Sequence, residues 1–124
     1  MKKELFFTKS HEWVEFLEDT TARVGISDFA QGELGDLVFV NLPEAGDEVM
    51  TGESFADVES VKAVSNVYSP VSGTVRTINE ELLDQPEFVN SNAFDAWFIE
   101  VENITDKAEL MTAEEYQSFL KEAH

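Results

Sequence analysis

Short runs of β-branched, aromatic and other apolar residues occupy most of the first hundred or so positions, and polar turn-forming residues separate these runs. Runs of this length and composition are typical of β-strands. The pattern predicts strands at Phe6–Phe7, Glu12–Phe16, Thr21–Ile26, Leu37–Leu42, Ser54–Ser60, Val64–Tyr68, Gly73–Ile78 and Trp97–Val101. The chain is therefore expected to be mainly β.

Two short helices are expected between these strands. Ser27 is a suitable N-cap for a helix that begins at residues 28–30 and ends at Gly35. Residues 80–83 have the composition of a second helical turn, which Pro86 would stop.

The last part of the chain has a different pattern. From Asp106 onward it is helical, and Leu110, Tyr116, Phe119 and Leu120 form one apolar stripe. We expect this tail to cap the open end of a β sandwich rather than to bind a partner.

Composition sets the size and the charge of the molecule. With 124 residues, 43% of them hydrophobic, the chain is expected to form one domain with its own core, residues 1–124. The core is expected over about residues 8–102 and the helical cap over about residues 106–123. The formal net charge of −18 argues against nucleic acid and anionic membranes as partners and favours proteins with basic patches.

Other classes of chemistry have little support in the sequence. The chain has no cysteine, and its two histidines, His11 and His124, are too far apart in sequence to suggest a pair of metal ligands. The start of the chain has no apolar stretch of signal-peptide length, and no segment approaches a membrane span. We therefore expect a cytoplasmic protein.

Lys62 is the candidate functional residue. It is the only basic residue between Arg23 and Arg76, a segment that contains nine carboxylates. The run on each side of it is strand-like, and Gly52 and Gly73 lie at similar distances before and after it, which suggests two hairpin-like halves with the lysine at a tight turn.

An amine in this position suits attachment rather than catalysis. Neighbouring carboxylates favour the charged form of lysine, whereas a Schiff-base lysine needs burial or a nearby cation. A ligase that acylates Lys62 can supply the deprotonation itself, and Glu59 is the natural recognition residue for such a ligase. The alternative is an ordinary surface lysine on a hairpin.

Several blocks of the chain resemble, in order, those of the glycine cleavage system H protein family. They are Ser10-His11-Glu12-Trp13, Gly25-Ile26-Ser27-Asp28-Phe29-Ala30-Gln31, Leu34-Gly35-Asp36-Leu37-Val38-Phe39-Val40, Leu42-Pro43, Gly46-Asp47, Glu59-Ser60-Val61-Lys62-Ala63, Ser69-Pro70-Val71-Ser72-Gly73 and Pro86-Glu87-Phe88-Val89-Asn90. The resemblance runs from about Thr8 to the final helix, with Phe88 where the family more often has leucine.

The resemblance implies a flattened antiparallel β sandwich of the lipoyl/biotinyl type, a barrel-sandwich hybrid, with short helices and a C-terminal helix. It implies lipoate attached covalently to Lys62. Biotin is a poor second, because biotin carriers usually flank their lysine with methionine and this chain has Val61 and Ala63.

The implied function is that of a carrier that is not itself an enzyme. It would take the aminomethyl group of glycine from glycine decarboxylase, a pyridoxal-phosphate enzyme, to a folate-dependent aminomethyltransferase. It would then pass reducing equivalents to dihydrolipoyl dehydrogenase. A lipoate ligase or a lipoyl/octanoyl transferase would load it, and a carrier that visits several enzymes is best as a monomer.

The resemblance also implies a cleft that shelters the loaded arm, with Ser10, Glu12 and Asn66 at the matching positions. A carboxylate at Glu12 would hold a cationic amine through a charge-assisted hydrogen bond. The alternative for Glu12 is an ordinary outward-facing strand residue, and we expect His11 to be structural and Trp13 to anchor the core.

The chain departs from the family pattern in two places. Asn66 replaces the usual aspartate, which keeps an acceptor oxygen and loses the charge. The usual Pro-Tyr-Gly-x-Gly-Trp segment is replaced by Ala93-Phe94-Asp95-Ala96-Trp97, one residue shorter. These departures leave open a related carrier of the same fold for lipoate relay or another redox pathway. A separate alternative, from a different class, is an unmodified acidic interaction module in which Lys62 is merely exposed.

Overall fold

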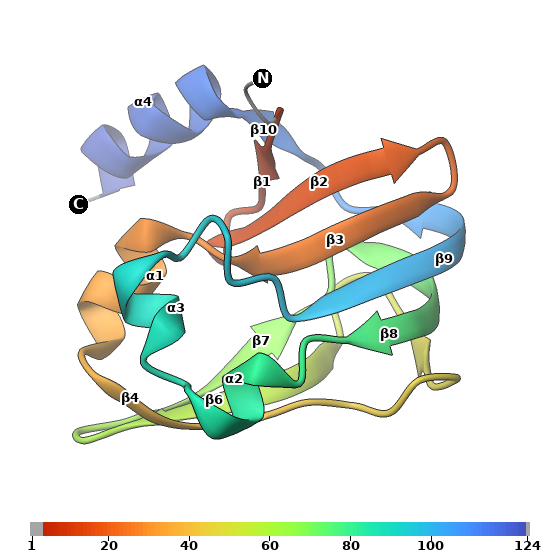
Figure 1. Ribbon diagram of the computed structural model, residues 1–124. Coiled ribbons are helices and arrows are strands. Elements are labelled where there is room, and N and C mark those ends of the chain that lie inside the picture. The colour runs from red at the N-terminus through yellow and green to blue at the C-terminus, as the bar shows by residue number, and fades with distance from the viewer. Residues whose placement is uncertain (1–3, 124) are drawn as a thin grey trace.

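The computed structural model describes residues 4–123 and contains two antiparallel sheets that pack face to face (Figure 1). The larger sheet has seven strands. In spatial order these are β10 (Met111–Thr112), β1 (Phe6–Phe7), β2 (Glu12–Glu18), β3 (Thr21–Ile26), β9 (Ile99–Lys107), β8 (Val71–Ile78) and β5 (Glu48–Val49).

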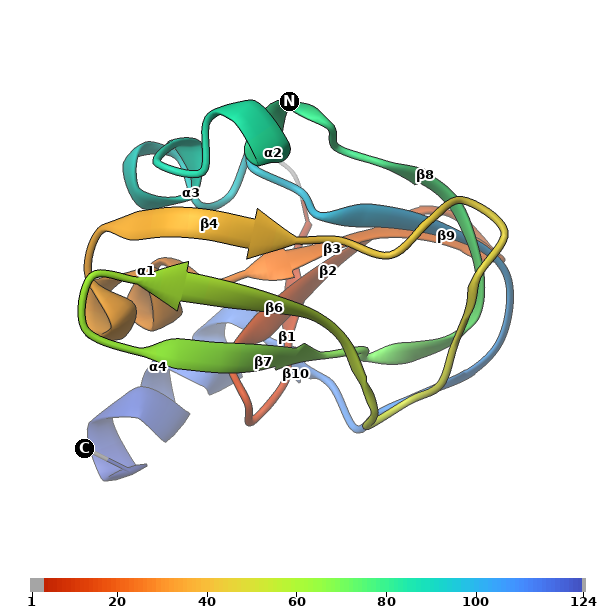
Figure 2. The same cartoon turned by 90° about the horizontal axis from the view of Figure 1, so that it is seen from below.

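The smaller sheet has three strands in the order β4 (Leu37–Asn41), β6 (Ser54–Ser60) and β7 (Val64–Tyr68). Figure 2 views the molecule from the side of this sheet and shows the β6–β7 turn at the same end as helix α1 (Asp28–Leu34). Helices α2 (Glu81–Asp84) and α3 (Phe88–Ser91) lie beside β4, and α4 (Ala113–Ala123) lies on the other side of the molecule, next to β1 and β10.

Valine side chains from both sheets form most of the core. Val14, Val24, Val75 and Val101 of the larger sheet, with Val58 and Val67 of the smaller one, are buried in a single cluster. Alternation along β6 explains the packing, because Ala56, Val58 and Ser60 are buried while their neighbours are partly exposed. The expected mainly β sandwich is confirmed.

A second, smaller cluster attaches α4 to the sandwich. Phe7, Trp13 and Tyr116 are buried in it, and Phe119 and Leu120 pack against it. Trp13 is therefore a core anchor, as expected. Tyr116 stacks on Phe7 with the ring centroids 4.4 Å apart.

The eight expected strands are all present, but the structure adds elements that the sequence pattern did not predict. Strands β5 and β10 and helix α3 were missed. The prediction of helix from Asp106 is wrong at its start, because β9 continues to Lys107 and α4 begins at Ala113. Leu110 accordingly packs against the main core and not with the α4 stripe.

The two glycines around Lys62 have different roles. Gly52 has a φ of +84° in the turn before β6, as expected for a turn glycine. Gly73 lies within β8 and not at a turn. A Cβ at Gly73 would lie 2.6 Å from the backbone oxygen of Glu102, so close approach of β8 and β9 requires glycine there.

Candidate functional site

Lys62 is exposed in the turn that joins β6 to β7. Ser60 organises this turn: its hydroxyl accepts hydrogen bonds from the backbone N–H groups of Lys62 (3.3 Å) and Ala63 (3.0 Å). The Ser60 amide donates to the Ala63 carbonyl oxygen at 2.8 Å. These bonds fix the backbone while leaving the lysine side chain outside the fold.

The stem of Lys62 lies over the end of helix α1. Gly35 closes this helix with a φ of +85°, and a Cβ added to it would lie 3.4 Å from Cε of Lys62. The next residue, Asp36, accepts a hydrogen bond through its carbonyl oxygen from the Val61 amide at 3.2 Å. The turn therefore rests on the segment between α1 and β4.

The surface around the turn combines apolar side chains with a carboxylate. Val61 is 75% exposed and Val64 is 68% exposed. Glu59 pairs in register with Phe39 of β4 on one side and Val64 of β7 on the other. Glu59 is partly exposed and lies on the same hairpin, three residues before the lysine.

Glu12 is buried, with only 2% of its surface exposed, so it is not the outward-facing strand residue that was the alternative. One carboxylate oxygen accepts hydrogen bonds from the hydroxyls of Thr8 (2.7 Å) and Ser10, and the other accepts from the Tyr68 amide at 3.1 Å. Burial raises the pKa of Glu12, and these hydrogen bonds offset only part of that effect. The carboxylate has its hydrogen bonds but no cation in contact with it among the described residues.

Strand β7 connects the lysine turn with Glu12. Backbone N–H groups alternate in direction along a strand, so those of Val64 and Asn66 lie on the same edge as that of Tyr68, away from β6. From Val64 to Tyr68 this edge spans about 13 Å, at about 3.3 Å per residue. Asn66 lies midway with its side chain exposed, opposite Asp57 of β6.

A second hydrogen-bonded group holds the loop that carries Ser10. The Tyr116 hydroxyl lies 2.8 Å from Nδ1 of His11 and 2.8 Å from the Ser27 hydroxyl, and burial raises the pKa of Tyr116. His11 has a φ of +74°. This group connects α4, α1 and the loop before β2, which agrees with a structural role for His11.

The segment from Ala93 to Trp97 makes its turn without glycine. The amides of Asp95 and Ala96 both donate to the Asn92 carbonyl oxygen at 2.9 Å, which closes a separate turn after α3 has ended at Ser91. The Ala93 carbonyl oxygen accepts from the Trp13 indole at 3.0 Å. The shorter segment therefore reaches β9 by a helical turn that is bonded to the core.

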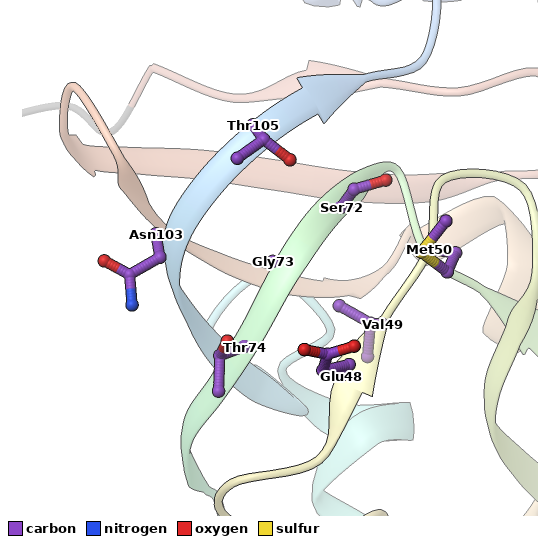
Figure 3. A pocket seen from close by; sticks show the side chains of 8 residues that line it. All are labelled: Glu48, Val49, Met50, Ser72, Gly73, Thr74, Asn103 and Thr105. Atoms are coloured by element: carbon purple, nitrogen blue, oxygen red, sulfur yellow. The ribbon is translucent and has the colours of Figure 1, made fainter.

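A pocket of about 170 Å³ lies at the other end of the molecule, along β5, β8 and β9 (Figures 2 and 3). It is lined by Glu48, Val49, Met50, Ser72, Gly73, Thr74, Asn103 and Thr105. None of these is a candidate site residue. Within residues 4–123 there is no cluster of histidine, cysteine and carboxylate side chains that could hold a metal ion. No helix in that range is long and apolar enough to span a membrane.

The sequence predicts roles in loading or sheltering the arm for Lys62, Glu59, Ser10, Glu12 and Asn66. In the structure these residues lie along the β6–β7 hairpin, at the start of β2 and in the loop before β2. Sequence reasoning missed Thr8 and Tyr68, which bind the Glu12 carboxylate, and Tyr116. No sequence signal marks Tyr68, because it acts through its backbone amide. A sandwich of two antiparallel sheets with an exposed lysine at a hairpin turn and a C-terminal helix defines a carrier domain of the lipoyl/biotinyl type.

Comparisons with known proteins are consistent with this class. A family model described as glycine cleavage H-protein matches residues 5–123. A glycine cleavage system H protein of Lachnoclostridium phytofermentans is 60% identical over 119 residues, which cover 96% of this chain and 94% of that protein. The H protein of Geobacillus kaustophilus is 51% identical over 123 residues, 97% of this chain and 96% of the relative.

The fold comparison gives the same result. The crystal structure of a glycine cleavage system H protein from Mycobacterium marinum superposes with a TM-score of 0.90 at 37% identity and covers 98% of this chain and 99% of that one. The chain belongs to the glycine cleavage H-protein family, the carrier component of the glycine cleavage system.

Proposed function

We propose that Lys62 carries lipoate in amide linkage and that this chain carries the aminomethyl group of glycine from glycine decarboxylase to the aminomethyltransferase, and then reducing equivalents to dihydrolipoyl dehydrogenase. The observation that carries the proposal is the exposed lysine on a turn held by Ser60, in a chain of this family. When bound, lipoate supplies a disulfide that accepts the one-carbon unit and two electrons.

The residues at the turn fit such a group. The Lys62 amine is on the outside of the fold, and its stem lies over Gly35 at the end of α1. A loading enzyme, either a lipoate ligase or a lipoyl/octanoyl transferase, would recognise Glu59 and the apolar residues beside it. Because the turn is already ordered, binding it costs such an enzyme little conformational entropy.

The length of the arm matches the distance along β7. A lysine stem with a lipoyl chain contains about a dozen single bonds and extends to about 14 Å. The edge of β7 spans about 13 Å between Val64 and Tyr68. An arm folded back along this edge would end near Glu12, whose carboxylate is buried and has no cation in contact with it among the described residues.

Glu12 and Ser10 are the groups that would hold a cationic amine in this cleft. A charge-assisted hydrogen bond from the amine would offset the cost of burying the carboxylate, and the surrounding fold would exclude water. Asn66 lies beside the path of the arm and offers an acceptor oxygen without a charge. We propose that it contributes a weaker contact than an aspartate would.

The acidic surface suits transient encounters with basic partner enzymes, because electrostatic steering raises association rates. We propose that the protein works as a monomer in the cytoplasm, where each partner docks in turn at the lysine end of the smaller sheet. The carrier itself then performs none of the three reactions.

The test is the mass of the protein isolated from its own host. A lipoyl increment on the peptide that contains Lys62 is the expected result, with Lys62→Arg as the variant that stays unmodified and Lys107→Arg as the matched control that is still modified. Unmodified protein from cells supplied with lipoate would overturn the proposal in favour of an acidic interaction module.

A second assay addresses the pathway. The lipoylated protein is mixed with unlabelled glycine, glycine decarboxylase, pyridoxal phosphate and labelled bicarbonate, and the entry of label into the carboxyl group of glycine is measured. Exchange that depends on Lys62 is expected for glycine cleavage. Lipoylated protein that supports no exchange would instead favour lipoate relay or another redox pathway.

A further inference from the structure

The side-chain amide of Asn90, on helix α3, forms hydrogen bonds to the tripeptide Gly35–Leu37, which is far from it in sequence. Its nitrogen donates hydrogen bonds to the carbonyl oxygen of Gly35 at 2.9 Å and to the side-chain oxygen of Gln31 at 2.8 Å. Its oxygen accepts a hydrogen bond from the Leu37 amide at 2.8 Å. The half-buried Asn90 side chain is therefore hydrogen-bonded to Gly35 and Leu37, the residues on both sides of Asp36.

The same tripeptide forms the support of the lysine turn. Its three residues face the turn in antiparallel order, with Leu37 against Ser60, Asp36 against Val61 and Gly35 against Lys62. The middle contact is the 3.2 Å hydrogen bond from the Val61 amide to the Asp36 carbonyl oxygen. Asn90 thus binds the Gly35–Leu37 tripeptide, and the tripeptide in turn contacts the lysine turn.

We propose that Asn90 is a positioning residue for the modification of Lys62: it fixes the Gly35–Leu37 tripeptide so that the turn is presented in one conformation. This inference rests on the proposed function of Lys62. Asn90 does not touch the lysine, and it acts through the backbone of the three residues between α1 and β4.

The physical argument concerns local order. Gly35 has no side chain to pack, and it sits at a helix end, so its position depends on hydrogen bonds. Without the Asn90 amide, the tripeptide gains conformational freedom and the Val61–Asp36 bond opens more often. A loading enzyme would then have to order the turn on binding, which raises its KM for the carrier.

Two variants and one control separate this role from general stabilisation. Asn90→Ala removes all three hydrogen bonds. Asn90→Asp keeps the size and the acceptor for the Leu37 amide, but it places a carboxylate oxygen against two other oxygens. Asn92→Ala is the control, because the Asn92 side chain is exposed and donates to the hydroxyl of its neighbour Ser91.

The first measurement is amide hydrogen exchange under native conditions. We expect both Asn90 variants to speed exchange at Val61 by about tenfold or more. The Phe98 amide, which donates to the Val24 carbonyl oxygen at 2.7 Å in the core, should change little. Equal acceleration at Val61 and Phe98, or no change at Val61, would overturn the inference.

The second measurement is steady-state loading by a purified lipoate ligase with lipoate and ATP, with the carrier as the varied substrate. We expect the Asn90 variants to raise the KM for the carrier by about fivefold, with a much smaller change in kcat, and Asn92→Ala to match the wild type. Wild-type KM in the Asn90 variants would contradict a positioning role.

The two hypotheses fail in different ways. If no loading enzyme modifies the wild-type protein, the proposed function is refuted, whatever Asn90 does. If the wild-type protein is loaded and the Asn90 variants are loaded equally well, only the role of Asn90 is refuted.

Discussion

The buried carboxylate of Glu12 permits a quantitative test through Glu12→Gln. Burial raises the pKa of Glu12 above the ordinary 4.5, so the folded state keeps the Glu12 proton to a higher pH than the unfolded chain does. Stability therefore falls as pH rises between the unfolded and the folded pKa. Glutamine abolishes this dependence, and its amide can still accept from the Tyr68 N–H and donate to the hydroxyls of Thr8 and Ser10.

The expected magnitude follows from linkage. Each unit by which the pKa of Glu12 is raised costs the wild type about 1.4 kcal/mol of stability at neutral pH. The unfolding free energy of the variant minus that of the wild type should rise with pH and level off above the folded pKa. The total rise must equal the shift measured by NMR multiplied by about 1.4 kcal/mol per unit. Any fixed cost of altered hydrogen bonds cancels, because it is present at every pH.

The assay combines two measurements. Urea unfolding at a series of pH values, from about 4 to about 8, gives the stability difference, and a carbon-detected NMR titration of the Glu12 carboxyl gives its pKa directly. Glu18→Gln is the control, because it removes one charge from an exposed position of the same strand. A pH-independent difference after that correction, or an NMR value at or below the ordinary 4.5, would refute the conclusion that burial dominates at Glu12.

Three further substitutions test other parts of the structure. Burial acts to raise the pKa of Glu100, but hydrogen bonds from two arginines outweigh burial and lower that pKa. The Glu100→Gln variant should therefore be less stable than the wild type at neutral pH, and this difference should disappear as pH falls through the folded pKa of Glu100. Thermal unfolding at several pH values measures the difference. Tyr116→Phe removes the hydroxyl that bridges His11 and Ser27 and should cost about 1–2 kcal/mol in urea unfolding, and an unchanged midpoint would contradict this role. Ser60→Ala should speed amide exchange in the lysine turn by about tenfold, and wild-type exchange would show that the hydroxyl does not order the turn.

The strands that the sequence predicts well are those with strong local patterns. Thr21–Ile26, Ser54–Ser60 and Val64–Tyr68 have the bounds expected from their apolar runs and flanking turns. The N-cap at Ser27 is also local, and its hydroxyl accepts from the Ala30 amide at 3.2 Å. Where hydrogen bonds and burial depend on neighbours in sequence, the pattern is sufficient.

The missed elements depend on distant parts of the chain. The two-residue strands β5 and β10 exist because Glu48 pairs with Thr74 and Thr112 pairs with Phe6. The residues of these two strands, Glu48-Val49 and Met111-Thr112, do not form an apolar run that would have marked them as strands, as Phe6 and Phe7 do. The C-terminal helix starts late for the same reason, because pairing of β9 with β8 extends to Lys107.

In the candidate site, too, features set by neighbouring residues can be predicted from the sequence, and features set by distant residues cannot. Lys62 is conspicuous in the sequence because of its isolation among carboxylates. The burial of Glu12 is not, since a charged residue in a strand usually faces solvent. Its burial depends on the Tyr68 amide, which lies 56 residues away in the chain. The contacts of Asn90 are equally remote, 53 to 59 residues from their partners.

Under the proposed function of Lys62, the order of the strands bears on when the lysine can be modified during synthesis of the chain. The three strands of the smaller sheet lie between residues 37 and 68 and are hydrogen-bonded through short-range pairs, so they can form early. The larger sheet cannot be completed until β9 has been synthesised, because Val101 of β9 pairs with Ala22. Asn90, whose side chain binds the Gly35–Leu37 tripeptide, also emerges late from the ribosome. A ligase that recognises only the β6–β7 hairpin would modify an incomplete nascent chain. A ligase that requires the contacts of Asn90 would modify only the completely folded protein. The timing of lysine modification on nascent chains would therefore report which of these structures the ligase recognises.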